Sequence, residues 1–368
     1  MSSQPLVIQK NSMKICKKLF ISSMASLFFF ACRKDDITPK FNTVPPRPVN
    51  MNLSASKLIL LQGNESKTAI TLNWGSAQDG HNEKVTYIIE SAAEGAQFAD
   101  PVEMGSSDQL SAFFTVKDFN SKMCKLIIPG THGRVEFRVK IVKPCAGNSV
   151  VYSDAIALDV TPYQPFIEYE SSKIIRIPGN FQNWKVASAP KLISSKIAGE
   201  YEGYVQFTNP YSQFLMVKGS TEWDPKVTYN YIGANKFGFG GSMFSIFGGA
   251  GIYRLQVNTN TNTWAYTKIN SWGLNGSAVS GNANTDAAMI FDETTSSWSI
   301  TTNLAKGDFR FRANNSNAIN FGHNASTETG IPDYNGEAIS IAKAGSYTIT
   351  LNLTEAGNYV YGVMKNYL

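Results

Sequence analysis

The stretches "GIYRLQVNTNTNTWAYTKI" (residues 251–269) and "GSYTITLNLTEAGNYVYGVMK" (345–365) are built on one plan. Each begins with Gly-x-Tyr, continues as an alternating apolar–polar run, and reaches a second, aromatic run after a polar turn. Alternation with a period of two is typical of β-strands, so each stretch predicts a pair of strands. The spacing of the two copies is that of whole domains, far beyond the roughly 20–50 residues of solenoid repeats. Residues 170–269 and 270–368 are therefore predicted to be two copies of one β-sandwich.

The segment before these copies predicts a further sandwich. It contains four short alternating runs that end in Gly, Asn, Asp or Pro: "KTAITLNW", "KVTYIIES", "RVEFRVKIV" and "DAIALDVTPY". Strands at this density over about 110 residues are typical of an antiparallel sandwich. We expect an immunoglobulin-like domain over residues 51–165, with Trp74 in its core. The predicted fold class is all-β: an N-terminal immunoglobulin-like sandwich followed by two tandem β-sandwiches.

The N-terminus reads as an export signal. Lysines precede an apolar run, "LFISSMASLFFFA" (19–31), which is shorter than the ~20 residues needed to cross a bilayer. Small Ala31 stands directly before Cys32, which favours cleavage there and lipidation of the Cys32 sulfur. The alternative is an uncleaved signal anchor, against which the charged "CRKDD" counts. We expect a signal peptide over residues 1–31 and a Pro-rich tether over 32–50.

Composition narrows the class of protein. The net charge of +5 falls to +1 once the four lysines of residues 1–31 are set aside, because no acid lies among them. A nearly neutral chain does not favour nucleic-acid binding.

Cys124 and Cys145 either pair in an oxidising exterior or remain two buried thiols. The cysteine and histidine spacing predicts no metal site, and we expect no cofactor.

The chain resembles the SusE/SusF family of outer-membrane starch-binding lipoproteins. The resemblance rests on the cysteine with its "CRKDD" tag, on "LNW", "VTY", "FRVK" and "DVTPY" in the first domain, and on "FRAN" and "AGSYTITL" in the last. It implies a spacer domain followed by two carbohydrate-binding-module-like sandwiches on the outer face of the outer membrane of Bacteroidetes-type bacteria. It also implies that the protein works beside a TonB-dependent porin and its partner lipoprotein.

Two tryptophans of the first repeat are the candidate binding residues. Trp184 lies in "PGNFQNWKV" and Trp223 in "GSTEWDP", both polar loop segments with little structural need for an indole. Flat apolar rings suit the C–H faces of sugars, and the family places its aromatic platform at about these positions. The family's basic residue falls on Lys218. Further hydroxyl partners are expected from Asp224, Asn183 and Glu222. The alternative is that either tryptophan only closes one end of the sandwich.

The second repeat lacks this platform. Asn317 stands where the first repeat has Trp223, and "SGNAN" stands where it has Trp184. The polar candidates that remain are Arg312, Asn314 and Asn315. Trp272 and Trp298 are expected in the core, so this repeat is predicted to bind weakly or to be a structural copy. The glycine-rich stretch 233–251 lacks the phosphate-loop spacing and is expected to be a long surface loop.

The predicted function is non-catalytic capture of a polysaccharide or oligosaccharide, starch-like or another glycan, for import. The acids lie mostly in turns and do not suggest a glycosidase pair, and no hydrolase motif occurs. The alternative is a structural stalk that contacts the uptake complex without binding glycan itself.

Overall fold

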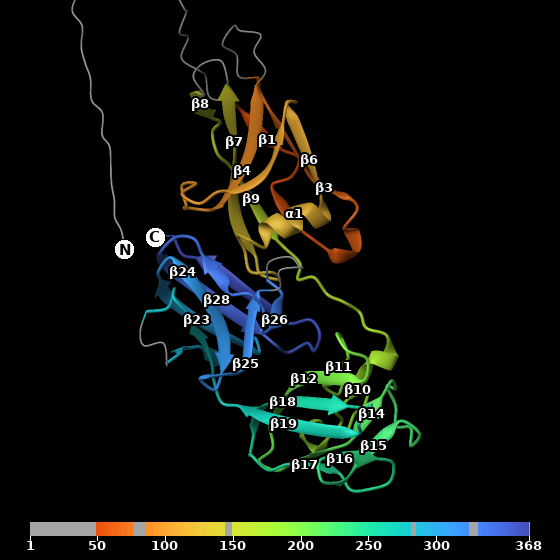
Figure 1. Cartoon of the computed structure of the whole chain (residues 1–368). Coiled ribbons are helices and arrows are strands. Elements are labelled where there is room, and N and C mark those ends of the chain that lie inside the picture. Colours follow the sequence, from red (N-terminus) through yellow and green to blue (C-terminus); the bar gives the residue numbers. More distant parts are fainter. Residues whose placement is uncertain (1–48, 77–84, 144–148, 281–284, 324–329, 368) are drawn as a thin grey trace, which may run out of the picture. The chain divides into compact units, whose positions relative to one another are not determined.

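The computed structural model describes residues 49–76, 85–143, 149–280, 285–323 and 330–367, and its regular structure is almost entirely β (Figure 1). The all-β prediction is confirmed. No helix within these ranges is long and apolar enough to cross a bilayer. The signal peptide predicted over 1–31, Cys32, and the tether up to residue 48 lie outside the described residues.

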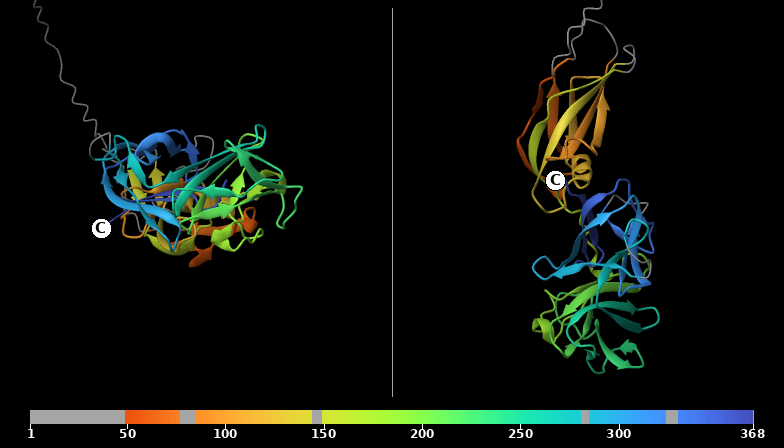
Figure 2. Two further views of the ribbon diagram at one scale, coloured as in Figure 1. Left: turned by 90° about the horizontal axis from the view of Figure 1, so that it is seen from below. Right: turned by 90° about the vertical axis from the view of Figure 1, so that its left-hand side faces the viewer.

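The N-terminal sandwich spans residues 51–161. Its elements are β1 (Met51–Leu53), β2 (Lys57–Ile59), η1 (Gln62–Asn64), β3 (Thr68–Trp74), β4 (Thr86–Ala93), β5 (Val102–Ser107), β6 (Ser111–Thr115), α1 (Val116–Met123), β7 (Gly133–Lys143), β8 (Ser149–Tyr152) and β9 (Ile156–Thr161). They form a sheet β1-β3-β6 and a sheet β2-β9-β7-β4-β5, with β8 beside β7. The helix α1 lies at one end of the sheets (Figures 1 and 2).

Alternation buries one face of each strand in this sandwich. In β3, Ile70, Leu72 and Trp74 are buried, whereas the residues between them are less so. The core position predicted for Trp74 is confirmed. Cys124 follows α1, and its Sγ lies 3.9 Å from the Tyr163 carbonyl oxygen. Cys145 lies outside the described residues, so the pairing of the two cysteines stays a prediction.

The first repeat follows. Its elements are η3 (Ser171–Lys173), β10 (Ile174–Arg176), η4 (Asn180–Gln182), β11 (Lys191–Ile193), β12 (Glu200–Phe207), β13 (Ser212–Phe214), β14 (Met216–Lys218), β15 (Thr228–Gly233), β16 (Lys236–Gly238), β17 (Phe244–Ile246), β18 (Gly251–Asn258) and β19 (Thr263–Ile269). The ladder β10-β11-β12-β18-β19-β16-β15-β14 closes on itself, and β13 pairs with β17 beside it. The closing pair, β16 with β19, is held by one register pair, Lys236 with Thr263.

The surface loop predicted for residues 233–251 is wrong for much of that stretch. It contains β16 and β17, and Phe237 and Phe244 from these strands are buried in the core. Three-residue strands are too short to show alternation, and the surrounding glycines hide them.

The second repeat contains β20 (Trp272–Asn275), β21 (Ala287–Ala288), β22 (Ile290–Asp292), β23 (Ser297–Leu304), β24 (Gly307–Ala313), β25 (Ser316–His323), β26 (Pro332–Tyr334), β27 (Ile339–Ile341), β28 (Gly345–Asn352) and β29 (Val360–Lys365). One sheet has the order β21-β20-β24-β25-β26, with β27 beside β24, and the other has the order β22-β23-β28-β29. Trp272 and Trp298 are buried, as predicted.

The two repeats share their strand pairings. The run β12-β18-β19 corresponds to β23-β28-β29, and the pair β10-β14 corresponds to β20-β24. Ile175 of β10 pairs with Lys218, and Gly273 of β20 pairs with Arg312. Ile175 is a core residue, whereas the core residue Trp272 of β20 pairs with Ala313, so the position that matches Lys218 is Ala313, one residue after Arg312.

Candidate functional site

Trp184 lies in a tight turn after β10. Gly179 forms a bridge with Phe214, and a Cβ at Gly179 would lie 2.4 Å from the Gln213 carbonyl oxygen, so only glycine permits this approach. The chain then turns through η4, after which Asn183 has φ +60° and Trp184 has φ +58°. The Trp184 N–H donates to the Gly179 carbonyl, 2.9 Å away. A bulky residue in this left-handed region is rare, and such residues cluster at functional sites.

Trp223 lies in the turn between β14 and β15. The Ser220 hydroxyl accepts the Glu222 N–H at 3.0 Å, and the Asp224 carboxylate accepts the Lys226 N–H at 2.9 Å. These bonds on either side of Trp223 hold the backbone in place, while the indole remains 46% exposed.

The structure brings the two indoles together. Their ring centroids are 6.5 Å apart, with an angle of 40° between the ring planes. Trp184 is half-buried and Trp223 is exposed. Two rings tilted toward each other at this distance form a shallow aromatic surface, which we call the Trp184–Trp223 pair.

The polar candidates of the first repeat have different surroundings. Lys218 ends β14 half-buried, and its Nζ lies 5.7 Å from the centre of the Tyr201 ring. Asn183 and Glu222 are exposed in the two turns that carry the indoles. Asp224 is half-buried and already holds the Lys226 N–H, so one of its carboxylate oxygens has an internal partner.

Arg312 in the second repeat lies in a different environment from Lys218. It is 8% exposed, and its Nε donates to Asp286 Oδ1 at 2.8 Å, with Nη2 bonded to the same oxygen. Asn315 Oδ1 accepts the Asp286 N–H at 3.2 Å. Asn314 accepts the backbone N–H of Asn270 at 2.7 Å. The polar side chains of this repeat are thus engaged in internal contacts that hold its strands together.

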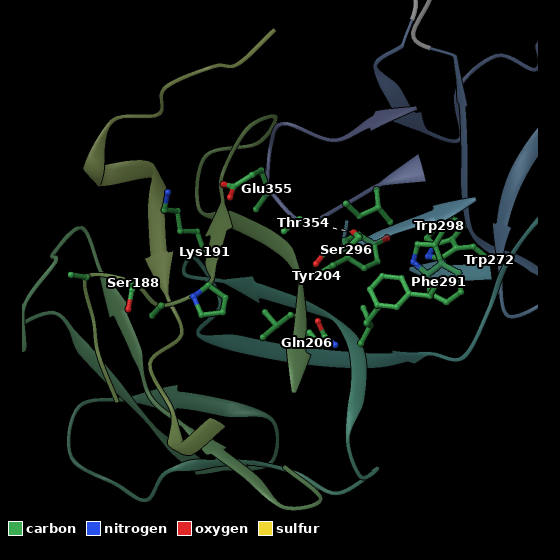
Figure 3. Close-up of a pocket in the computed structure, with 17 residues that line it drawn as sticks. Ser188, Lys191, Tyr204, Gln206, Trp272, Phe291, Ser296, Trp298, Thr354 and Glu355 are labelled. Atoms are coloured by element: carbon green, nitrogen blue, oxygen red, sulfur yellow. Dashed lines mark hydrogen bonds between the residues drawn. The ribbon is translucent and has the colours of Figure 1, made fainter. Parts of the chain in front are cut away.

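Two cavities lie where the repeats meet. The smaller is about 370 Å³, with Trp272, Phe291 and Trp298 on one side and Ser188 and Lys191 on the other (Figure 3). Its full lining is Ala187, Ser188, Ala189, Pro190, Lys191, Tyr204, Val205, Gln206, Ile252, Trp272, Phe291, Ser296, Trp298, Leu353, Thr354, Glu355 and Ala356. Tyr204 packs into the core of the second repeat, so this cavity belongs to the contact between the repeats.

The larger cavity, about 830 Å³, is lined by a tyrosine–carboxylate network. The Tyr359 hydroxyl donates to Glu202 Oε1 at 2.8 Å, and Arg254 Nη2 lies 3.2 Å from Glu202 Oε2. Tyr334 also lines it, and burial raises the pKa of both tyrosines well above the usual 10.0, which keeps them protonated. Both Glu202 oxygens therefore have internal partners.

Among the described residues, no group of three or more His, Cys, Asp or Glu side chains is placed to hold a metal ion.

Comparisons with known proteins give a family match for the N-terminal part of the chain. Residues 35–140 match the family model described as SusE outer membrane protein. Among solved structures, SusF from Bacteroides thetaiotaomicron aligns over 86% of this chain and 77% of its own, with 10% identity and a TM-score of 0.25. A search of the curated proteins found no match. Residues 35–140, less than a third of the chain, are therefore similar to the family described as SusE outer membrane protein.

Proposed function

We propose that the protein captures a polysaccharide at the outer face of the outer membrane, held there by lipid on Cys32, within a Sus-type uptake system. The Trp184–Trp223 pair carries this proposal, because its rings lie 6.5 Å apart and Trp223 is 46% exposed. An exposed aromatic pair is costly to keep in water unless it serves a contact. Indole faces match the apolar faces of sugar rings and lose little conformational entropy on binding.

Polar groups of the first repeat would supply orientation. Lys218 can only donate hydrogen bonds and the Asp224 carboxylate can only accept them, so together they suit a pair of neighbouring sugar hydroxyls. Asn183 offers both functions. We propose these three residues as hydroxyl partners, with the N-terminal sandwich as a spacer from the membrane.

The second repeat serves mainly as a structural copy. No tryptophan stands at Asn317, and Arg312 is paired with Asp286 in the interior. A buried guanidinium with a carboxylate partner would lose that partner's hydrogen bonds on turning toward a sugar. Capture by the first repeat alone gives weak affinity, about 10 µM to 1 mM.

Weak sites suffice when many copies share one membrane. A long chain held by several copies dissociates slowly, because each rebinding event is effectively intramolecular. Single sites that release readily also allow transfer to a TonB-dependent porin and its partner lipoprotein, the partners we propose.

Capture without catalysis is part of the proposal. Glycosidases need two carboxylates free to act as acid and as base or nucleophile. Glu202 and Asp286, two of the more enclosed carboxylates, hold Arg254 and Arg312 instead.

Retention on insoluble polysaccharides tests the proposal. The chain of residues 32–368 carrying Cys32→Ser would be mixed with starch, xylan, mannan and fructan, beside Trp184→Ala, Trp223→Ala and the double variant. We expect each single variant to lose about tenfold in affinity, since stacking on one ring contributes on the order of 1 kcal/mol or more. Phe113→Ala is a matched control, because Phe113 is an exposed aromatic of the N-terminal sandwich.

Three results would count against the proposal. Full retention by both tryptophan variants would place the site elsewhere. A wild-type chain that none of the polysaccharides retains would favour the structural stalk instead. Release of reducing ends from a retained glycan would contradict capture without catalysis.

A further inference from the structure

The first repeat carries a second exposed aromatic pair. Tyr211 is 50% exposed and Phe247 is 76% exposed, and their ring centroids are 6.0 Å apart at an interplanar angle of 55°. Ser212 of β13 pairs with Ile246 of β17, so Tyr211 and Phe247 lie opposite each other just beyond this ladder. Their neighbours Ser212 and Ile246 are buried. The two rings thus remain outside while the strands beside them enter the core.

Both rings are held on fixed backbone. The Tyr211 hydroxyl lies 3.2 Å from Ser245 Oγ. After Phe247 the chain is tied to β18 and β19, since Lys268 Nζ donates to the Gly248 carbonyl at 2.5 Å and the Tyr253 hydroxyl donates to the Gly249 carbonyl at 2.8 Å. A rigid, exposed aromatic pair loses little freedom on binding, which favours stacking on a ligand.

One turn joins this pair to the Trp184–Trp223 pair. Asn180 Nδ2 donates to the Tyr211 carbonyl at 3.0 Å, and Asn180 Oδ1 accepts the Gln213 N–H at 3.0 Å. The same turn carries Trp184 four residues later, and four residues span at most about 14 Å. The hydrogen bond from the Trp184 N–H to the Gly179 carbonyl folds the chain back on itself, which shortens that distance further. The two aromatic pairs therefore belong to one end of the first repeat, within the reach of several consecutive sugar rings.

Polar groups surround the second pair as they do the first. Gln213 Nε2 lies 3.4 Å from the Tyr211 hydroxyl, and Ser245 Oγ lies on the other side of that hydroxyl. The Gln213 amide and the hydroxyls of Tyr211 and Ser245 can each donate and accept hydrogen bonds. They therefore suit neutral sugar hydroxyls better than a charged ligand.

We propose that Tyr211 and Phe247 form a second stacking subsite for the same glycan, so that the first repeat selects chains long enough to reach both aromatic pairs. This inference rests on the proposed function and adds chain length to it. A short oligosaccharide fills only the Trp184–Trp223 pair, and a longer one gains the second contact without a second loss of translational freedom.

Affinity as a function of chain length tests the inference. The chain of residues 32–368 carrying Cys32→Ser would be titrated with trisaccharides and octasaccharides of α-1,4-glucan, xylan, mannan and fructan. For the glycan that binds, we expect the octasaccharide to bind about tenfold or more tightly than the trisaccharide. Tyr211→Ala and Phe247→Ala should each remove most of that gain and leave the trisaccharide affinity unchanged. Phe113→Ala, an exposed aromatic elsewhere, should change neither.

The outcomes separate this inference from the proposed function. Trp184→Ala and Trp223→Ala should weaken both oligosaccharides. If they do so while Phe247→Ala and Tyr211→Ala keep the full gain with chain length, the second subsite is wrong and the proposed function stands. If no glycan of either length binds the wild type, both fail. Tyr211→Leu keeps apolar volume without a flat ring, so loss of the gain in that variant with an unchanged melting temperature supports stacking.

Discussion

The Gln182 side chain binds both backbone polar groups of Lys185. The Lys185 N–H donates to Gln182 Oε1 at 2.8 Å, and Gln182 Nε2 donates to the Lys185 carbonyl at 3.0 Å. This closed ring spans Asn183 and Trp184, the two residues of this turn that have positive φ. One amide side chain therefore stabilises the turn that presents the Trp184 indole.

Gln182→Ala should loosen that turn. Net contributions of about 0.5–1.5 kcal/mol per hydrogen bond, reduced by exposure, give an expected loss in the free energy of unfolding of about 1 kcal/mol. Glycan affinity should fall by roughly threefold to tenfold, because binding must then order Trp184 again. Polysaccharide retention and chemical unfolding would be measured together. Gln182→Glu keeps the Oε1 acceptor but loses the Nε2 donor, so its stability and its glycan affinity should lie between those of Gln182→Ala and the wild type. Affinity that stays at the wild-type level in Gln182→Ala would show that the turn does not position Trp184.

The left-handed backbone at Trp184 predicts an inverted order of stabilities. Alanine is ordinarily as stable as glycine or more so, but at φ +58° its Cβ is strained and glycine is not. Trp184→Gly should therefore exceed Trp184→Ala in the free energy of unfolding by roughly 0.5–1 kcal/mol. Both variants lose the indole and should lose glycan binding equally. Urea denaturation would give the order, and a more stable alanine variant would contradict the strain.

Much of this fold follows from the sequence because long strands carry their own pattern. β3 and β9 lie within two of the runs predicted as strands, β4 and β7 overlap the other two and extend one or two residues beyond them, and β18 and β28 begin at the repeated Gly-x-Tyr. The short elements could not be predicted. The helix α1 covers two turns, capped by Thr115, whose hydroxyl accepts the Asp118 N–H at 3.1 Å, and such a length shows no clear period.

The site was predictable only in part. Indoles in polar loops point to Trp184 and Trp223, but their 6.5 Å separation depends on how the turns after β10 and β14 fold against the barrel. Arg312 is a polar candidate in the sequence, yet its partner Asp286 lies in an irregular segment that no sequence pattern connects with it. Tyr211 precedes β13 and Phe247 follows β17. Both strands have three residues, so alternation does not mark the two aromatic residues as exposed.

Arg312 should be a structural residue. Removing one partner of a buried ion pair leaves the other charge without compensation and typically costs about 3–5 kcal/mol. Arg312→Ala is therefore expected to lower the free energy of unfolding by about 3 kcal/mol. Arg310→Ala, on the same strand but exposed, should cost less than about 1 kcal/mol.

Glycan retention completes that test. Under conditions where Arg312→Ala remains folded, retention on polysaccharide should equal that of the wild type. A selective loss of retention with unchanged stability would instead make Arg312 a binding residue. Thermal unfolding beside the pull-down separates the two.

The Asp100 carboxylate predicts the direction in which the free energy of unfolding changes with pH. Asp100 lies before β5 and contacts Lys343 and Lys365 of the second repeat, with Lys365 Nζ 2.8 Å from Oδ2. Burial alone would raise the pKa of the Asp100 carboxyl, but the hydrogen bonds from the two lysines outweigh it, and the pKa lies below the usual 3.8. A lowered pKa means that the stabilisation is fully present above pH 3.8 and is lost as the pH falls through the folded-state pKa.

Asp100→Asn should therefore lower the free energy of unfolding at neutral pH, and the difference from the wild type should shrink in the acid range. The pKa of Lys365 is raised, first by its hydrogen bond to Asp100, so the same contact should also weaken as the pH rises through that pKa, above the usual 10.5. Chemical unfolding measured from acid to alkaline pH would show both the loss of stability at low pH and the loss at high pH. In a Lys343→Met, Lys365→Met background the effect of Asp100→Asn should disappear, because the carboxylate then has neither lysine to pair with. An effect that persists in this background, or one that grows in acid, would contradict the contact as the cause.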